Sequence, residues 1–579
     1  MLTKYDCGKL RRLLVVLKLS IVMALPNYAL AAQPVLNFSD IESGPKTGNT
    51  DGVGGLTSAQ HGAIVTVWGN NLGSTQGNSK IYIGGVEAAH VYYWKDADGT
   101  FPGGSSDLKT YHKMQEIAFS IPSGAPDGPA KITVKVDSID STSLPFTVRL
   151  GNIRYVKTGG NDSGIGTWSK PWASLEYVVS GAGGGLTAGD IIYSVGVGTT
   201  KPLTIAGPLT GTSLNPLSLI SYPNSLVKLT GTGVNGYSVY NTGNNPSSYW
   251  NFSKIKVETT GSAFSPVLGA RWVGLEITGP TVYAGYSGAI GGSNSLQAGG
   301  GKIYGLYIHH YGTDNGVATA GNLGTQPPAT GTWDVFQHLF YLSARNPSLQ
   351  IEGYEIAWGH FTDNPIYQGI HIYDMGTSIG WISPIKIHHN VIKNQRGNAI
   401  NVDLPSLIST PIEIHDNLCI SDVDDVYNSA ALHVVVYNPS IPIKIYNNTF
   451  YGYNVQNSLS GGTIDYRNNI VFDTKGVAYL DGSPASQSSN LFYSSKSKLL
   501  AIPVWSNSEL NLDPRFVDTM GNDFSLKPDS PIRSLGADSV LSVSPTDFWG
   551  KVRKAGSVSI GAFDYDTSPK KMNATIITP

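Results

Sequence analysis

The sequence predicts an all-β protein in which a small sandwich is followed by a stacked solenoid. Two observations carry this prediction: short segments in which apolar and polar residues alternate, and longer segments that recur with similar sequence about every 20 to 35 residues. The composition agrees, because 68 glycines and 33 prolines supply turns while 40% of the 579 residues are hydrophobic. Only 14% are charged, and a net charge of −2 gives no electrostatic footprint for nucleic acid.

Residues 1–31 have the pattern of a secretory signal peptide. Basic residues from Lys4 to Arg12 precede an apolar run over residues 13–25, and Ala29-Leu30-Ala31 forms a small-x-small cleavage site. The apolar run is short for a membrane span, and no later stretch reaches the roughly 20 apolar residues that a span needs. We therefore expect a secreted or periplasmic protein without a membrane span, and we expect a monomer. Cleavage leaves Cys419 as the only cysteine, so no intrachain disulfide is expected.

Residues 33–150 are predicted to form the small β-sandwich. Alternating runs over residues 63–68, 80–83 and 131–136 are separated by turns rich in glycine, asparagine and proline. The segments that resemble the IPT/TIG immunoglobulin-like family are Gly62–Gly73, Ile83–Val86, Ile121–Pro122 and Asp127–Gly128. This resemblance implies a spacer or a binding module without chemistry of its own.

Two groups of motifs frame the rest of the chain. Tyr155–Asp162, Lys170–Trp172 and Gly189–Tyr193 stand near its start, and Asp513–Val517 and Ile560–Phe563 near its end. They resemble the opening cap and the closing segment of right-handed parallel β-helix proteins, the group that includes pectate lyases and related carbohydrate-active enzymes. The resemblance implies that the immunoglobulin-like sandwich precedes a right-handed parallel β-helix solenoid, with these parts: β-helix 151–567 and C-terminal tail 568–579.

The repeats can be followed without this resemblance. Pro384–Ile392 recurs as Pro411–Cys419 and as Pro442–Phe450, with a weaker copy at Thr463–Ile470. The copies share an asparagine at one position: Asn390, Asn417, Asn448 and Asn469. We expect these asparagines at one corner of the solenoid, where asparagine tolerates a left-handed backbone and stacked amides bond from coil to coil.

A second strand in each coil carries a polar or aromatic residue between two apolar ones, at spacings of 30, 30 and 32 residues. These central residues are Tyr341, His371, Asn401 and His433. Because the flanking residues point into the core, the central ones should point outward. Stacked coils lie about 4.8 Å apart, so the four side chains should form one ladder that is long enough to meet several sugar units.

The groups on this ladder suit cleavage of a uronic-acid-containing extracellular polysaccharide by β-elimination. Such a reaction needs a base, a proton donor and a cation that stabilises the enolate-like charge. We predict His371 as the base, Arg345 as the neutraliser, and Tyr341 or His433 as the donor. The residues predicted to bind substrate are Asn401, Asp374, Asp403, His338 and Trp333.

Two alternative functions stay open. Asp374 and Asp403 could form the carboxylate pair of a glycoside hydrolase. The chain could also be a non-catalytic surface scaffold or glycan-binding protein, since a fold does not fix a function. An enzyme should place perturbed titratable groups in a cleft walled by residues 313–332, whereas a scaffold should present an evenly solvated face.

A further outward column is expected to contain Gln350, Lys386, Glu413 and Lys444. Its alternating charges favour a ladder of paired surface groups, each pair contributing little. The functional alternative is a lysine base, which some β-helix lyases use.

The sequence predicts no metal-ligating residues and no nucleotide site, and it leaves calcium open as a cofactor. Ser421–Asp425 is an acidic turn of the kind that suits calcium, and many pectate-lyase-like enzymes bind this ion, but the run has no second contributor. The histidines have no zinc spacing. The adjacent pairs His309-His310 and His388-His389 are expected to face opposite sides of their strands and so to share no metal.

Overall fold

The computed structural model describes residues 32–565 apart from short internal gaps, and Gln33–Tyr565 form one compact unit. The gaps are 182–184, 232–236, 242–247, 266, 280–286, 295–298, 312–336, 345–351, 365–367, 375–383, 396, 405–409, 423–429, 437, 439, 454, 476–477, 482–483 and 496–509. The expected signal peptide and C-terminal tail lie outside the described residues. No helix among the described residues is long and apolar enough to cross a membrane.

Two sheets form the N-terminal part, and their strands are antiparallel except for the pair β2–β10. The first sheet has the order β1 (Val35–Ser39), β3 (His61–Asn70), β7 (Gln115–Pro122) and β6 (His90–Asp96). The second has the order β2 (Ser43–Gly44), β10 (Leu144–Val148), β8 (Gly128–Val136), β4 (Lys80–Ile83) and β5 (Val86–Glu87), with β9 (Ile139–Asp140) on β8. A short 3₁₀ turn, η1 (Val53–Gly55), precedes β3. The predicted N-terminal antiparallel β region is thus confirmed.

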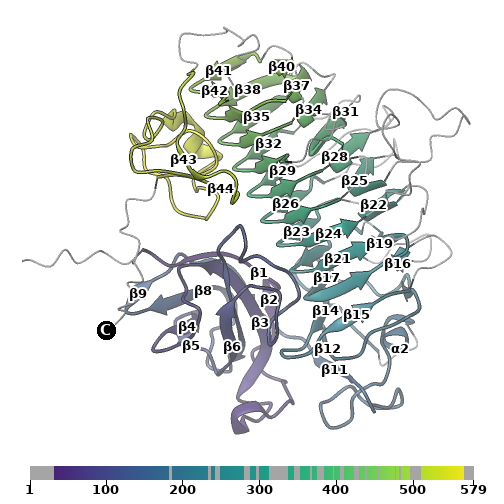
Figure 1. Cartoon of the computed structure of the whole chain (residues 1–579). Helices are drawn as coiled ribbons and strands as arrows, with labels where there is room; N and C mark the ends of the chain where they lie inside the picture. The colour runs from purple at the N-terminus through teal and green to yellow at the C-terminus, as the bar shows by residue number, and fades with distance from the viewer. Residues whose placement is uncertain are drawn as a thin grey trace, which may run out of the picture. The chain divides into compact units, whose positions relative to one another are not determined.

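Three long parallel sheets follow and form a β-helix, because successive coils add a strand to each sheet in turn (Figure 1). We name them sheets 1, 2 and 3 in the order in which the chain passes through them within each complete coil. Sheet 1 consists of β11 (Ile153–Lys157), β12 (Ile191–Val195), β14 (Leu217–Ser221), β17 (Trp250–Ser253), β20 (Arg271–Val273), β23 (Lys302–Tyr304), β26 (Glu355–Ala357), β29 (Ile385–His388), β32 (Ile412–His415), β35 (Pro442–Tyr446), β38 (Thr463–Arg467) and β41 (Ser486–Ser488). The predicted all-β solenoid is confirmed.

Sheets 2 and 3 complete the coils. Sheet 2 consists of β15 (Val227–Leu229), β18 (Ile255–Glu258), β21 (Glu276–Gly279), β24 (Tyr307–Tyr311), β27 (His360–Thr362), β30 (Val391–Lys393), β33 (Leu418–Ile420), β36 (Thr449–Tyr451), β39 (Ile470–Phe472) and β42 (Leu491–Tyr493). Sheet 3 consists of β13 (Leu203–Ile205), β16 (Tyr237–Asn241), β19 (Ser262–Phe264), β22 (Ser287–Asn294), β25 (Gln337–Ala344), β28 (Gln368–Asp374), β31 (Ile400–Leu404), β34 (Ala430–Val436), β37 (Val455–Gly461) and β40 (Ala478–Asp481).

The core of the solenoid is a stack of inward apolar side chains. In β29 the inward residues Ile385 and Ile387 are fully buried, whereas Lys386 between them reaches solvent. At the start, the short helix α2 (Leu175–Val179) buries Leu175 and Val178 in this core. The period-2 alternation therefore explains which face of each strand is outward, and outward faces are where a site can lie.

The predicted asparagine ladder runs along the corner between sheets 1 and 2. The Nδ2 group of each asparagine donates to Oδ1 of the next asparagine. The three bonds, from Asn390 to Asn417, from Asn417 to Asn448 and from Asn448 to Asn469, are each 3.0 Å long. The prediction that these asparagines themselves have a left-handed backbone was wrong by one residue. The positive φ belongs to the preceding residues, which are His389, Asp416, Asn447 and Asn468.

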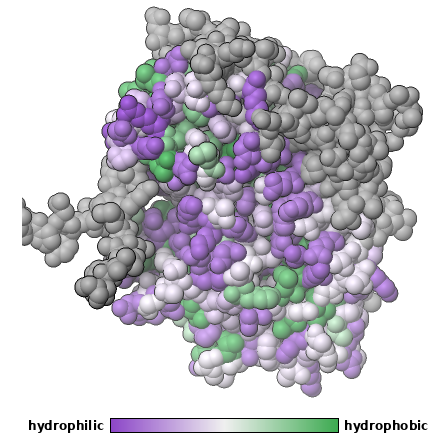
Figure 2. Space-filling model, in the orientation of Figure 1, coloured by the Kyte–Doolittle hydropathy of each residue, from purple (hydrophilic) through white to green (hydrophobic). Residues whose placement is uncertain are grey.

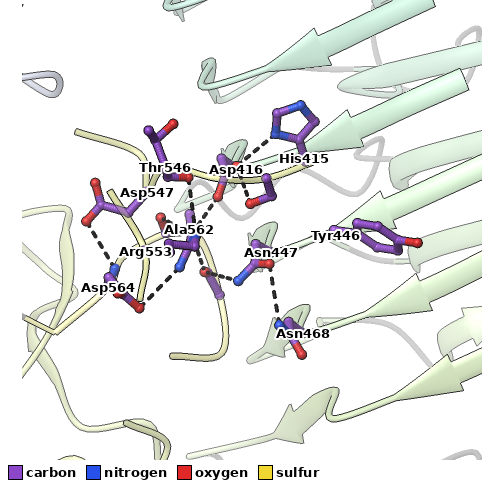
Figure 3. Close-up of polar contacts among 12 residues, drawn as sticks. His415, Asp416, Tyr446, Asn447, Asn468, Thr546, Asp547, Arg553, Ala562 and Asp564 are labelled. Atoms are coloured by element: carbon purple, nitrogen blue, oxygen red, sulfur yellow. Dashed lines mark hydrogen bonds and ion pairs between the residues drawn. The ribbon is translucent and has the colours of Figure 1, made fainter. Parts of the chain in front are cut away.

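The C-terminal segment, residues 510–565, packs against this corner and sheet 2, as the yellow chain in Figure 1 shows. It contains β43 (Phe516–Asp518), β44 (Asp523–Leu526) and the 3₁₀ turn η2 (Asp538–Ser542). The Arg553 guanidinium lies 2.6 Å from an Asp416 carboxylate oxygen and 3.2 Å from Asp564 (Figure 3). Ser544 donates to the other Asp416 oxygen at 2.7 Å.

The N-terminal sheets contact the first coils of the solenoid, on the sheet 1 side. The Tyr193 hydroxyl in β12 donates to the Ile64 carbonyl at 2.9 Å and accepts from the Ile64 amide at 2.7 Å. Arg271 in β20 pairs with Glu42 at 2.6 Å. The contacts made by the N-terminal sheets and by the C-terminal segment thus fall on described residues of sheets 1 and 2, their shared corner and the first coils. The outer face of sheet 3 lies away from these contacts.

We expect Arg553→Met to lower the free energy of unfolding by about 3–5 kcal/mol, because it leaves two buried carboxylates without their counter-charge. Urea unfolding of the two proteins would measure the loss. The matched control is Arg515→Met, which removes an exposed 2.7 Å pair with Asp529 and should cost about 0–1 kcal/mol. Equal losses in the two variants would contradict the assigned role of the buried pair.

Candidate functional site

The predicted outward ladder lies on sheet 3 in the predicted register. Tyr341 is opposite His371, His371 is opposite Asn401, and Asn401 is opposite His433. Their flanking residues are fully buried in the core: Phe340, Leu342, Ile370, Ile372, Ile400, Val402, Leu432 and Val434. The four polar side chains therefore share one outer face at the spacing of neighbouring strands, about 4.8 Å.

His338 joins this face because β25 bends just before Tyr341. Leu339 and Phe340 are consecutive and both lie in the core, which a straight strand does not allow. The bend brings the His338 ring into a stack on Tyr341, with centroids 4.8 Å apart, and 4.9 Å from the His371 ring. Tyr373 adds a further ring, 5.5 Å from His371 and 6.2 Å from Tyr341. The result is a cluster of aromatic and imidazole rings.

His371 lies in the middle of this cluster and has an unusual environment. Both of its ring nitrogens are shielded from solvent and have no hydrogen-bond partner among the described residues. Burial, and secondarily the neighbouring His433, lower the pKa of His371 to about 3. Its imidazole is therefore neutral at ordinary pH, with a proton on one nitrogen and a lone pair on the other. Leaving such groups unbonded costs roughly 1–3 kcal/mol each.

Hydrogen bonds among amide groups hold the ladder residue Asn401 in place. Asn398 donates through Nδ2 to Oδ1 of Asn401 at 2.8 Å, and its own Oδ1 accepts from the Ala430 amide at 3.0 Å. The backbone N–H of Asn398 donates to Oε1 of Gln368 at 2.8 Å. Asn401 is only 5% exposed. This predicted substrate ligand is thus fixed by its neighbours, and one of its acceptor positions is already used.

The two predicted carboxylates are not opposite each other. Asp403 is partly exposed and lies opposite Tyr373, whereas Asp374 lies opposite Ala344 and its side chain is not described. Arg345, Trp333 and the proposed wall over residues 313–332 lie outside the described residues. The strands of sheet 3 contain no lysine or arginine. A cation for this face must therefore come from the connections, and Arg345 directly follows β25.

The charged column on sheet 1 differs from the prediction at one end. Glu355 is opposite Lys386, so Glu355 and not Gln350 begins this part of the column. Glu413 lies 3.4 Å from Lys386 and 3.5 Å from Lys444. Both lysines are thus paired with the same carboxylate, as expected for a surface ladder, and this pairing disfavours the lysine-base alternative.

The prediction that adjacent histidines face opposite sides was wrong. Nδ1 lies 2.8 Å from Nδ1 in both pairs, His309 with His310 and His388 with His389. The physical reason is the backbone: His310 and His389 have φ of 50° and 56°, which turns each side chain back toward its predecessor.

One group of described residues has the spacing of a metal site but does not suit a cation. His389, His415 and Asp416 bring their ligand atoms within 4.8 Å of one another. Asp416, however, already binds Arg553, Ser544 and, at 2.8 Å, His415 (Figure 3). The Arg553 guanidinium therefore already supplies the positive charge that a metal ion would bring to Asp416.

The acidic turn that left calcium open is described only at its start. Asp422 pairs with Lys393 at 2.9 Å, and residues 423–425 lie outside the described residues. Calcium therefore stays an untested alternative.

Sequence reasoning missed two polar residues beside the ladder, Gln368 and Asn398. A signal for both was present. In three successive coils a polar residue stands three positions before the ladder residue: His338 before Tyr341, Gln368 before His371, and Asn398 before Asn401. The next coil has Ala430 at this position. Tyr373 follows His371 by two positions and so shares its outward direction.

No protein family matches the chain, and no curated protein matches it either. The fold and the residues of sheet 3 are therefore the ground on which a function must be argued.

Protonation of His371 should oppose folding, because burial holds its pKa at about 3 against about 6.5 in an unfolded chain. Its contribution to stability is then complete above about pH 6.5 and is lost progressively as the pH falls toward 3. We expect His371→Gln, which cannot be protonated, to lose less unfolding free energy than the parent between about pH 6.5 and about pH 4. Urea unfolding over a pH series would measure this, and parallel profiles would contradict it.

Proposed function

We propose that the protein binds an extracellular polysaccharide across the outer face of sheet 3 and cleaves a uronic-acid-containing polymer by β-elimination. The observation that carries the proposal is the neutral His371 with unbonded ring nitrogens. A general base must be unprotonated before it reacts. Neighbouring rings on the same face suit the apolar faces of sugars.

In the proposed reaction the bound polymer displaces the neighbouring rings that shield His371, and His371 then accepts the proton on C5 of the uronate. The electron pair of that C–H bond forms the C4–C5 double bond, and the C4–O bond to the leaving sugar breaks. Tyr341 or His433 donates the proton that the leaving oxygen takes up. Arg345 would neutralise the carboxylate, whose negative charge grows as the C5 proton leaves.

The glycoside hydrolase alternative has weaker support. Hydrolysis needs two carboxyl groups about 5–9.5 Å apart across the scissile bond. Asp403 is the carboxylate of the sheet 3 strands whose side chain is described, and the register separates it from Asp374 by one position along the strands. The scaffold alternative stays open, since a β-helix fold does not fix a function.

The N-terminal sheets are best explained as a spacer of the IPT/TIG kind that is attached to the solenoid. The buried contact of Tyr193 with Ile64 and the half-buried ion pair of Arg271 with Glu42 support this, because they leave little freedom for an independently moving module. We further propose that residues 1–31 direct export and that the protein acts outside the cytoplasm.

The test is ultraviolet absorbance during incubation with a panel of uronate polymers, with and without a calcium chelator. We expect absorbance to rise as unsaturated ends form, and His371→Ala to reduce the rate by at least about a hundredfold, the lower range for loss of a general base. The control is Lys444→Met on sheet 1, which should keep the parent rate.

Each other outcome identifies a different error. A parental rate in His371→Ala with a lost rate in Lys444→Met would move the site to sheet 1. Reducing ends without ultraviolet absorbance would establish hydrolysis and direct attention to Asp403. Binding of a polymer without either product would establish the scaffold.

A further inference from the structure

The histidine pair at the end of β24 forms a converging set of nitrogen atoms at the surface. Nδ1 of His309 lies 2.8 Å from Nδ1 of His310. The His309 side chain is 17% exposed, and His310 is exposed. The Tyr307 ring stacks on His309 at 4.2 Å between centroids, so the inner imidazole is held in place while the outer one is accessible.

Glu276 fixes which nitrogen of His309 carries the proton. Its Oε1 lies 3.1 Å from Nε2 of His309 and 2.7 Å from the Lys256 ammonium. A carboxylate oxygen is a hydrogen-bond acceptor, so it accepts the Nε2 proton of His309, which leaves the ring lone pair on Nδ1. Carboxylates hold metal-binding histidines in this way.

A carboxylate lies at the matching position of the next coil. His309 is opposite Thr362 in the register of β24 and β27, so His310 and Asp363 occupy equivalent places about 4.8 Å apart. Both have positive φ, 50° and 55°. Asp363 is exposed, and among the described residues its carboxylate has no hydrogen bond or ion pair. Binding of one ion by all three groups would require this exposed side chain to rotate toward the histidine pair.

We propose that His309, His310 and Asp363 bind a divalent cation of the Cu(II) or Ni(II) class. Metal–nitrogen bonds of about 2.0 Å make nitrogens 2.8 Å apart subtend about 90° at the metal. That is the angle between neighbouring ligands in square-planar and tetragonal sites, which Cu(II) and Ni(II) prefer. Binding requires His310 to carry its proton on the outer Nε2, so that both Nδ1 lone pairs face the metal.

The second histidine pair shows why the first is suited to a ligand. His388 and His389 have the same Nδ1 separation, but their other nitrogens lie 3.2 Å from Glu355 and 2.9 Å from the Asp547 carbonyl oxygen. They are also buried, at 7% and 3% exposure. That pair is enclosed by structural bonds, whereas the β24 pair opens to solvent.

The test is titration of the full mature chain with Cu(II), followed by calorimetry and by electron paramagnetic resonance. We expect one equivalent per chain with a tetragonal spectrum and nitrogen couplings. His310→Asn should abolish this site, Asp363→Asn should weaken it, and Glu276→Gln should weaken it by about ten- to a hundredfold. The matched control is Asp137→Asn, since Asp137 is also exposed with positive φ (46°), and it should bind as the parent does.

Two results would overturn the proposal. One is the absence of a stoichiometric Cu(II) site in the parent chain. The other is a site that His310→Asn leaves intact, which would place the copper on other histidines and reduce the 2.8 Å contact to a hydrogen bond between two imidazoles.

Discussion

Buried amides at the corner between sheets 1 and 2 hold neighbouring coils in register, and the outer columns depend on that register. Nδ2 of Asn417 donates to the Ile387 carbonyl at 2.8 Å and to Oδ1 of Asn448 at 3.0 Å, so one side chain joins three coils. A slip of one residue would leave these groups unsatisfied in the interior and turn the apolar face outward. The corner thus determines which side chains meet on sheet 3, although it lies on another edge of each coil.

The sequence predicted the columns wherever the coil length is regular. Tyr341, His371 and Asn401 follow one another at 30 residues, and the alternation of apolar residues fixes their direction. Gln350 was misaligned because Leu349-Gln350-Ile351 alternates in the same way as Tyr354-Glu355-Ile356, so periodicity alone could not locate the start of β26 at Glu355. The directions of the paired histidine side chains were predicted wrongly because the second histidine has a left-handed backbone, which breaks the alternation of sides along a strand. The sequence His-His does not indicate such a backbone.

The candidate site was predictable as a set of residues but not as a chemical environment. The neutral state of His371 results from burial among His338, Tyr341 and Tyr373, which come from two strands and meet because β25 bends. A bend between Leu339 and Phe340 has no signature in a pattern of apolar residues, since both are apolar. The positions of the ladder residues can therefore be predicted from the sequence periodicity, whereas the pKa of His371 depends on how neighbouring side chains pack around it.

The repeated corner also has a consequence for how such a chain can change in evolution. The coils that carry Asn390, Asn417, Asn448, Asn469 and Asn490 meet their neighbours through nearly the same bonds. In this part of the solenoid a complete coil is therefore the unit that can be duplicated or lost without disturbing the rest. A duplication would copy one member of every outward column along with the asparagine that joins it. The molecule can thus lengthen the outer face of sheet 3 by whole coils, while partial insertions are confined to the connections between strands.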